Sequence, residues 1–143
     1  MTLFSHPIHS ATVHFPIAFY ILGVLMTGMW LWRGQSDFER FAYWSFILSW
    51  VATLFATIFG LIDQSRLAID DPRRGNVNSH ITAGVALIIL NGLLIYMRFR
   101  WPDVLLRHRW PYLGVMVLGL VAVLATAWLG AELVYRFHIG ILQ

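Results

Sequence analysis

Three histidines lie within a short stretch near the start of the chain, at positions 6, 9 and 14. An apolar segment from Ile17 to Trp32 follows them at once. Unpaired imidazole nitrogens cost free energy in hydrocarbon, so histidines at the mouth of a membrane helix need a partner. The candidates are a haem iron, another metal, an acid or a water-filled cavity, and the rest of the sequence must supply the partner.

The elements that position these histidines are membrane helices. The chain has 143 residues, 59% apolar and 12% charged, whereas about 25% of residues in soluble domains are charged. Four apolar segments, near residues 11–33, 40–63, 79–98 and 111–135, each reach the roughly 20 residues that cross a bilayer. The sequence therefore predicts an all-α integral membrane four-helix bundle, with residues 1–143 as one domain.

Composition also excludes several classes of site and partner. The chain has no cysteine, so it carries no thiolate metal site and no iron–sulfur cluster of its own. Its net charge of +3 is spread over loops, and no basic face with exposed aromatic residues indicates nucleic acid. The expected environment is the lipid bilayer.

Four spans decide which residues can meet. The N-terminus, the 63–79 loop and the C-terminus share one side of the membrane, and only His108 among the histidines lies on the other side. The chemically competent residues expected on the shared side are His6, His9, His14, Asp63, His80, Glu132, Tyr135, Arg136 and His138.

Arginines set the expected orientation. The side with His108 carries six arginines, at positions 33, 40, 98, 100, 107 and 109, and the side with the other histidines carries four, at positions 66, 73, 74 and 136. The positive-inside rule then places the side with five histidines outward. We expect a multi-pass protein of a bacterial inner membrane, with both termini in the periplasm.

His14 and His80 each lie near the start of a predicted helix, on the same side of the membrane. Two neutral imidazoles that face each other across a bundle can ligate the iron of haem b. Arg136, Arg73 or Arg74 would be available to pair with haem propionates at the interface. The pattern indicates haem b with His14 and His80 as the metal ligands.

His9 lies five residues before His14, about 140° away around a helix, so the two cannot both point at one centre in a regular helix. Pro16 removes a helical hydrogen bond and is expected to distort the helix beside His14. His9 is then expected to lie beside the cofactor and contribute to its binding site, or to lie at the membrane interface. A second group is expected around the ligands and not on the metal: Asp63, Glu132, Tyr135 and His138.

Two other interpretations of the same residues stay open. Asp63 and Glu132 with His14 and His80 form a mixed nitrogen and oxygen set suited to zinc or iron. Alternatively, each histidine bonds an acid or a carbonyl and only packs the bundle or handles protons. Small residues at four-residue spacing, Ala52, Ala56 and Gly60 and again Ala122, Thr126 and Gly130, indicate close helix packing. No internal repeat is evident from the letters alone.

Several motifs together resemble a known family. They are His6-Pro7-Ile8-His9, His14-Phe15-Pro16-Ile17, Gly60-Leu61-Ile62-Asp63, His80 after a polar loop, and Gly130-Ala131-Glu132-Leu133-Val134-Tyr135 with a later Gly140. This combination resembles the bacterial "domain of unknown function 2231" membrane proteins over nearly the whole chain. Members usually have Gly-Gly where this chain has Gly130-Ala131, a minor departure.

The resemblance implies a four-helix membrane unit that works with redox proteins, because some members carry a Rieske domain after the last helix. Without cysteine, this chain would need a separate electron-transfer partner of Rieske or cytochrome type, and a homodimer is also compatible. The expected function is electron transfer by haem b, with quinol as a candidate donor. The alternative is a non-enzymatic accessory or assembly subunit of a larger membrane complex, and the residues leave open whether the protein is an enzyme.

Overall fold

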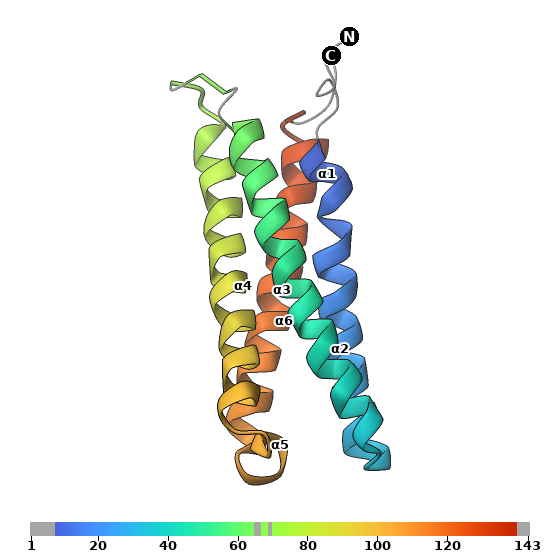
Figure 1. Ribbon diagram of the computed structural model, residues 1–143. Helices are drawn as coiled ribbons and strands as arrows, with labels where there is room; N and C mark the ends of the chain where they lie inside the picture. Colours follow the sequence, from blue (N-terminus) through green and yellow to red (C-terminus); the bar gives the residue numbers. More distant parts are fainter. Residues whose placement is uncertain (1–7, 65–66, 69, 140–143) are drawn as a thin grey trace.

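The computed structural model describes residues 8–64, 67–68 and 70–139. In it the chain forms a bundle of long helices (Figure 1). A single turn of helix, α1, precedes the first long helix, and another short helix, α5, precedes the last. The helices are α1 (Ile8–Thr12), α2 (His14–Arg33), α3 (Ser36–Gln64), α4 (Arg74–Arg100), α5 (Val104–Arg107) and α6 (Arg109–Tyr135). The described residues contain no strand, which confirms the predicted all-α class.

Four of these helices are long and apolar enough to cross a membrane, namely α2, α3, α4 and α6. Their outer surfaces carry large apolar side chains that a water-soluble protein would bury. Trp32, Phe99, Trp110 and Trp128 are each more than 70% exposed. Such a surface is stable only against lipid, so the bundle is an integral membrane protein.

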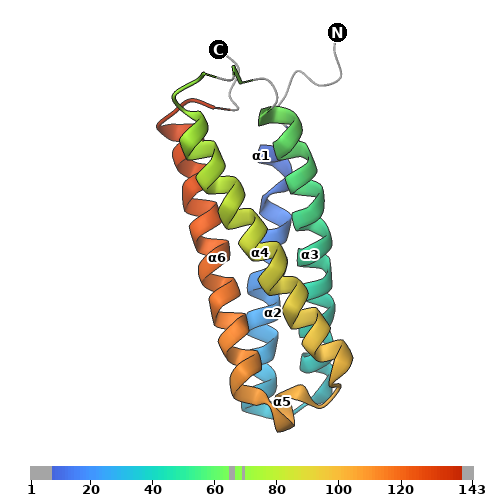
Figure 2. The same ribbon diagram turned by 90° about the vertical axis from the view of Figure 1, so that its left-hand side faces the viewer.

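The four spans form two hairpins. Helix α2 packs chiefly on α3 and α4 packs chiefly on α6, while α3 also contacts α4 and α2 also contacts α6. Helices α2 and α4 are therefore diagonal to each other, as are α3 and α6. Figures 1 and 2 show α1, the 67–73 connection and the end of α6 at one end of the bundle, with α5 at the other. This is the parity that four spans predict.

The core of the bundle contains aromatic and aliphatic side chains from all four spans. Tyr20, Phe46, Leu94 and Val123 are each at most 1% exposed, and the Tyr20 and Phe46 rings meet edge to face at 5.2 Å. The side-chain hydroxyl of Ser49 donates to the carbonyl oxygen of Pro16 at 2.9 Å. This bond ties α3 to the start of α2, close to the predicted histidine site.

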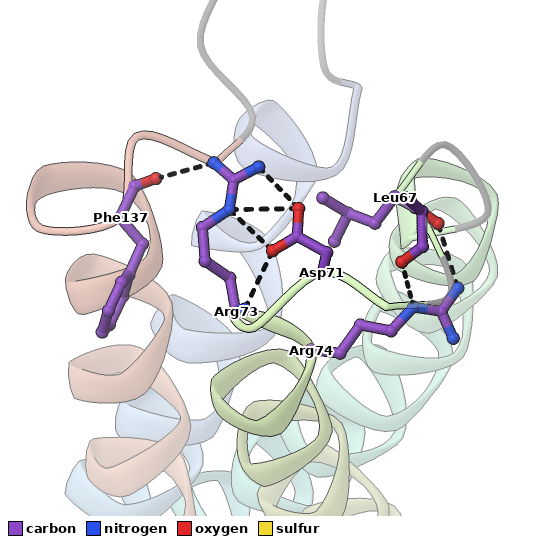
Figure 3. Close-up of polar contacts among 6 residues, drawn as sticks. Leu67, Asp71, Arg73, Arg74 and Phe137 are labelled. Carbon is purple, nitrogen blue, oxygen red and sulfur yellow. Dashed lines mark hydrogen bonds and ion pairs between the residues drawn. The ribbon is translucent and has the colours of Figure 1, made fainter.

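The predicted helix boundaries were wrong at one point that affects the site. Helix α4 begins at Arg74, earlier than the predicted residue 79, so the polar residues after Pro72 are helical. The Asp71 carboxylate accepts from the backbone N–H of Arg73 at 2.8 Å and from the Arg73 guanidinium at 2.7 Å (Figure 3). These bonds hold the connection in a turn that starts the helix one residue after Arg73.

The same connection is tied to the end of α6. The Arg73 guanidinium donates to the carbonyl oxygen of Phe137 at 3.3 Å, and the Arg74 guanidinium donates to the carbonyl oxygens of Leu67 and Ala68 at 3.0 and 2.8 Å (Figure 3). The loop between the second and third spans is therefore fastened at the end of the bundle where the histidines gather.

Candidate functional site

The segment that carries the first histidines keeps a helical backbone where it meets the first long span: Val13 has φ −63° and ψ −21°, and its N–H donates to the carbonyl oxygen of His9 at 3.1 Å. Helix α1 ends at Thr12 and α2 begins at His14, with a turn at Val13 between them. Pro16, which has no N–H, lies within the first turn of α2, where a missing donor is tolerated. The distortion expected beside His14 does not appear at Val13, and His9 and His14 point in different directions because they are five residues apart on a helical path.

The structure pairs His9 with His80. Their ring centroids are 5.8 Å apart and their planes meet at 84°, edge to face. His9 comes from α1 and His80 from α4, which lies across the bundle from α2. Both rings are partly buried. Two imidazoles from distant parts of the chain therefore meet inside one end of the bundle.

Each ring is oriented by a backbone carbonyl of a neighbouring helix. Nδ1 of His9 lies 2.7 Å from the carbonyl oxygen of Ala56 on α3. Nδ1 of His80 lies 3.1 Å from the carbonyl oxygen of Thr126 on α6. A carbonyl oxygen can only accept a hydrogen bond, so Nδ1 must carry the hydrogen in both neutral rings. The lone pair then resides on Nε2, the nitrogen that remains to bind a metal or a proton.

Glycine makes this approach of the rings to the carbonyls possible. A Cβ at Gly60 would lie 3.1 Å from Nδ1 of His9, and a Cβ at Gly130 would lie 3.1 Å from Cε1 of His80. In each case the glycine follows the bonded carbonyl by four residues, the position whose side chain lies over that carbonyl in a helix. The small residues at four-residue spacing thus position the histidines, a role the sequence assigned only to helix packing.

His14 is the correction. Its side chain is exposed, and the structure does not bring it to His80 as predicted. The buried stripe of α2 contains Pro16, Tyr20 and Gly23. His14 precedes Pro16 by two residues, about 200° around a helix, and so lies on the opposite face. His9 precedes Pro16 by seven residues, about 20° from the stripe, so His9 faces the interior.

The other predicted site residues are mostly at the surface. Arg136 and Glu132 pair with each other at 3.3 Å, and Tyr135 and His138 are exposed. Glu132 bonds Arg136, and of the two partners left open for the histidines, an acid or a carbonyl, the carbonyls of Ala56 and Thr126 are the ones that bond the rings. The side chain of Asp63 and the whole of His6 lie outside the described residues. Within the described part of the chain, no group of three metal-ligating side chains occurs.

Electrostatics at this end of the bundle centre on the 67–73 connection. Hydrogen bonds from the Arg73 side chain and backbone lower the pKa of the Asp71 carboxyl to about 2. The same contacts raise the pKa of the Arg73 guanidinium. All three predicted propionate partners are already bonded, Arg73 and Arg74 to loop atoms and Arg136 to Glu132. Arg136 has the more exposed side chain, 72% against 40% for Arg73.

A second polar cluster lies at the opposite end and was missed by the sequence analysis. Glu39 of α3 and Arg98 of α4 form an ion pair at 2.7 Å with both side chains 19% exposed. The Arg98 guanidinium also lies 6.0 Å from the ring centre of Tyr43. The signal was an acid immediately before one predicted span and a base at the end of the next, which four-span parity places at the same level. This pair joins the two hairpins below the core.

Comparison with known proteins places the chain in a family without assigning an activity. No curated protein and no solved structure matches it. A family model described as "Predicted membrane protein (DUF2231)" matches residues 5–143, nearly the whole length. The four apolar helices agree with that description. The chain therefore belongs to the DUF2231 family of predicted membrane proteins.

Proposed function

We propose that the protein binds haem b between His9 and His80 and transfers electrons at the outer face of a bacterial inner membrane. The observation that carries the proposal is the pair of imidazoles with both Nδ1 atoms bonded to backbone carbonyls. Ligating histidines typically donate their second N–H to a carbonyl or a carboxylate, which fixes the tautomer and the ring orientation.

The number of ligands favours haem over a bare metal ion. Zinc needs about four ligands, and a structural site takes them all from protein. A haem macrocycle supplies four nitrogens itself, so two histidines complete an iron with six ligands. In the described part of the chain, only two imidazoles converge, and no third metal-ligating side chain joins them.

The spacing of the two rings is close to, but shorter than, what this group would need. If each imidazole bound a six-coordinate iron through a nitrogen about 2 Å away, the ring centres would lie a little over ~6 Å apart. The observed separation is 5.8 Å. Small residues, Ala56, Gly60, Thr126 and Gly130, line α3 and α6 beside the rings. These small residues leave room for the imidazole rings, which lie directly against Gly60 and Gly130.

The residues of the chain would divide the work. His9 and His80 hold and orient the cofactor, and Ala56 and Thr126 fix their tautomers. Arg136, exposed beside Glu132, is placed at the interface where propionates would lie. Bound haem supplies one-electron transfer, and two protein ligands leave no position for oxygen. Quinol in the membrane, or a separate Rieske or cytochrome protein, is the proposed redox partner.

A visible spectrum tests the proposal. Protein produced with ample haem should show a Soret band that reports six-coordinate, low-spin iron. His9→Ala and His80→Ala should each remove or greatly weaken the band, because one axial bond is lost. His14→Ala and His108→Ala are matched controls that should keep it, since both of those side chains are exposed.

The same sample decides between the alternatives. A wild-type protein without a Soret band would overturn the haem proposal. Metal analysis would then separate a zinc or iron site, the second candidate, from a pair that only packs the bundle. The carbonyl bonds of both Nδ1 atoms are common to the two roles, so the spectrum and the metal content decide between them. A packing role would correspond to an accessory subunit of a larger complex.

A further inference from the structure

In the two diagonal helices, buried residues recur at the same intervals after a histidine. After His9, buried residues occur seven, eleven and fourteen positions later, at Pro16, Tyr20 and Gly23. After His80, buried residues occur at the same three intervals, at Leu87, Asn91 and Leu94. The interior stripe of α2 with α1 is thus repeated on α4, starting from a histidine in both cases.

The contacts of the two histidines are also repeated. His9 bonds the carbonyl of a residue 47 positions later, and His80 bonds the carbonyl of a residue 46 positions later. In both cases the glycine that meets the ring lies four positions after that carbonyl. Each hairpin therefore builds the same small arrangement of imidazole, carbonyl and glycine.

Reciprocal hydrogen bonds link the two hairpins. The hydroxyl of Tyr20 on α2 donates to the carbonyl oxygen of Met116 on α6 at 3.0 Å. The side-chain amide of Asn91 on α4 donates to the carbonyl oxygen of Phe46 on α3 at 3.3 Å. Asn91 is the counterpart of Tyr20 by the 71-residue offset that relates His9 to His80. Met116 is the counterpart of Phe46 by the 70-residue offset that relates Ala56 to Thr126. Across a two-fold axis, each contact from the first unit to the second is matched by the equivalent contact from the second unit to the first. The two hydrogen bonds have this relation.

We infer that residues 9–64 and 80–135 are two copies of one helical hairpin, related by a pseudo-two-fold axis along the bundle, and that His9 and His80 are equivalent ligands on this axis. Because each copy has two spans, the copies run parallel, with the axis along the membrane normal. The amino-acid letters alone do not reveal such a repeat. The repeat is carried by contact positions, and residue types have diverged around them.

The symmetry narrows the class of ligand, an inference that rests on the proposed function. A centre on the axis presents the same face to each histidine, so the site selects a ligand with two equivalent faces, such as the iron of a planar macrocycle. A metal ion with two further unlike ligands would have to break the symmetry. By the 71-residue offset that relates His9 to His80, the counterpart of His14 is Val85. His14 therefore has no equivalent histidine and is not part of the ligand pair.

Distances between spin labels test the repeat without any cofactor. Leu22 and Leu48 are exposed on α2 and α3, and their counterparts Leu93 and Leu118 are exposed on α4 and α6. The chain has no native cysteine, so the double variants L22C/L48C and L93C/L118C would carry label only at the chosen sites. We expect the same mean distance in both. A difference of about one helical turn, 5.4 Å, would overturn the duplication.

Substitution of each ligand tests the equivalence of the histidines. His9→Met and His80→Met should shift the Soret band by the same amount and release haem to the same extent. His14→Met is the control and should match wild type. If one histidine variant keeps the wild-type spectrum while the other loses it, the symmetric ligand pair is wrong. A wild-type protein without haem would sink the proposed function and this ligand pair, and the label distances alone would then decide the duplication.

Discussion

The ring of His9 lies against Gly60 so closely that a Cβ at residue 60 would stand 3.1 Å from its Nδ1 atom. That nitrogen is the one that bonds the carbonyl oxygen of Ala56. A side chain at residue 60 would push the ring away from this oxygen. The glycine therefore controls whether the carbonyl of Ala56 can orient the histidine, and Gly130 has the same relation to His80 and Thr126.

Substituting these glycines should destabilise the bundle. Gly60→Leu and Gly130→Leu force a histidine ring off its carbonyl, and overpacking of this kind costs about 1–3 kcal/mol. We expect both variants to unfold at lower temperature in detergent and to lose the proposed cofactor. Gly28→Leu is the control, because a Cβ there meets no atom within 4 Å. A melting temperature equal to wild type for Gly60→Leu would show that this face of α3 has room to spare.

The four spans could be predicted because hydropathy over about 20 residues reports bilayer crossing directly. The residue at which α4 begins could not be predicted in this way. Residues 74–79 are mostly polar, with Val77 the exception, and polar residues beyond the hydrocarbon can be helical or not without any change in hydropathy. The choice depends on Asp71, whose carboxylate fixes the turn at Arg73, and such a local contact has no signature in a hydropathy window.

The choice between His9 and His14 failed for a related reason. In a membrane span, the lipid face and the core face are both apolar, so periodicity of hydrophobicity does not distinguish them. Tyr20 and Thr27, both fully buried, do mark the interior face of α2. Counting back from Tyr20 by eleven residues reaches His9, the interval that also separates Asn91 from His80. This comparison of polar positions was available in the sequence and would have found the pair.

Removing the acid of the Glu39 and Arg98 pair should also destabilise the protein. Arg98 Nε is buried and has no hydrogen-bond partner among the described residues, so its guanidinium depends on Glu39. Hydrogen bonds to charged groups contribute about 1.5–3 kcal/mol, and we expect Glu39→Gln to lose a similar amount.

The matched control for this pair is Glu132→Gln. It breaks an ion pair of the same type, but the arginine there, Arg136, is 72% exposed, and exposed pairs contribute about 0–1 kcal/mol. Thermal unfolding of both variants in the same detergent checks the prediction. Equal losses in the two variants would mean that burial of the Arg98 pair adds nothing.

The Asp71 turn should make stability depend on pH only under acidic conditions. The folded pKa of Asp71, about 2, lies below the unfolded value of about 3.9. A depressed carboxyl pKa stabilises the fold above the unfolded pKa, and this contribution is lost as pH falls through the folded pKa. The melting temperature of wild type should therefore decline between about pH 4 and pH 2 more steeply than that of Asp71→Asn. Parallel curves for the two proteins would contradict the prediction.

Labelling of single cysteines should place the two ends of the bundle on opposite sides of the membrane. Gln35 lies in the turn between α2 and α3, and Asp70 lies in the connection between α3 and α4. Because the chain has no cysteine of its own, Gln35→Cys and Asp70→Cys each provide one thiol for an impermeant maleimide. The excess of arginine at the end that holds Gln35 predicts that this end is cytoplasmic.

Asp70→Cys should thus react in intact cells, once the outer barrier is opened, and Gln35→Cys only after the inner membrane is permeabilised. Reaction of both from one side would overturn the four-span arrangement. Exchange of the two results would keep that arrangement and place the histidine pair at the cytoplasmic face instead.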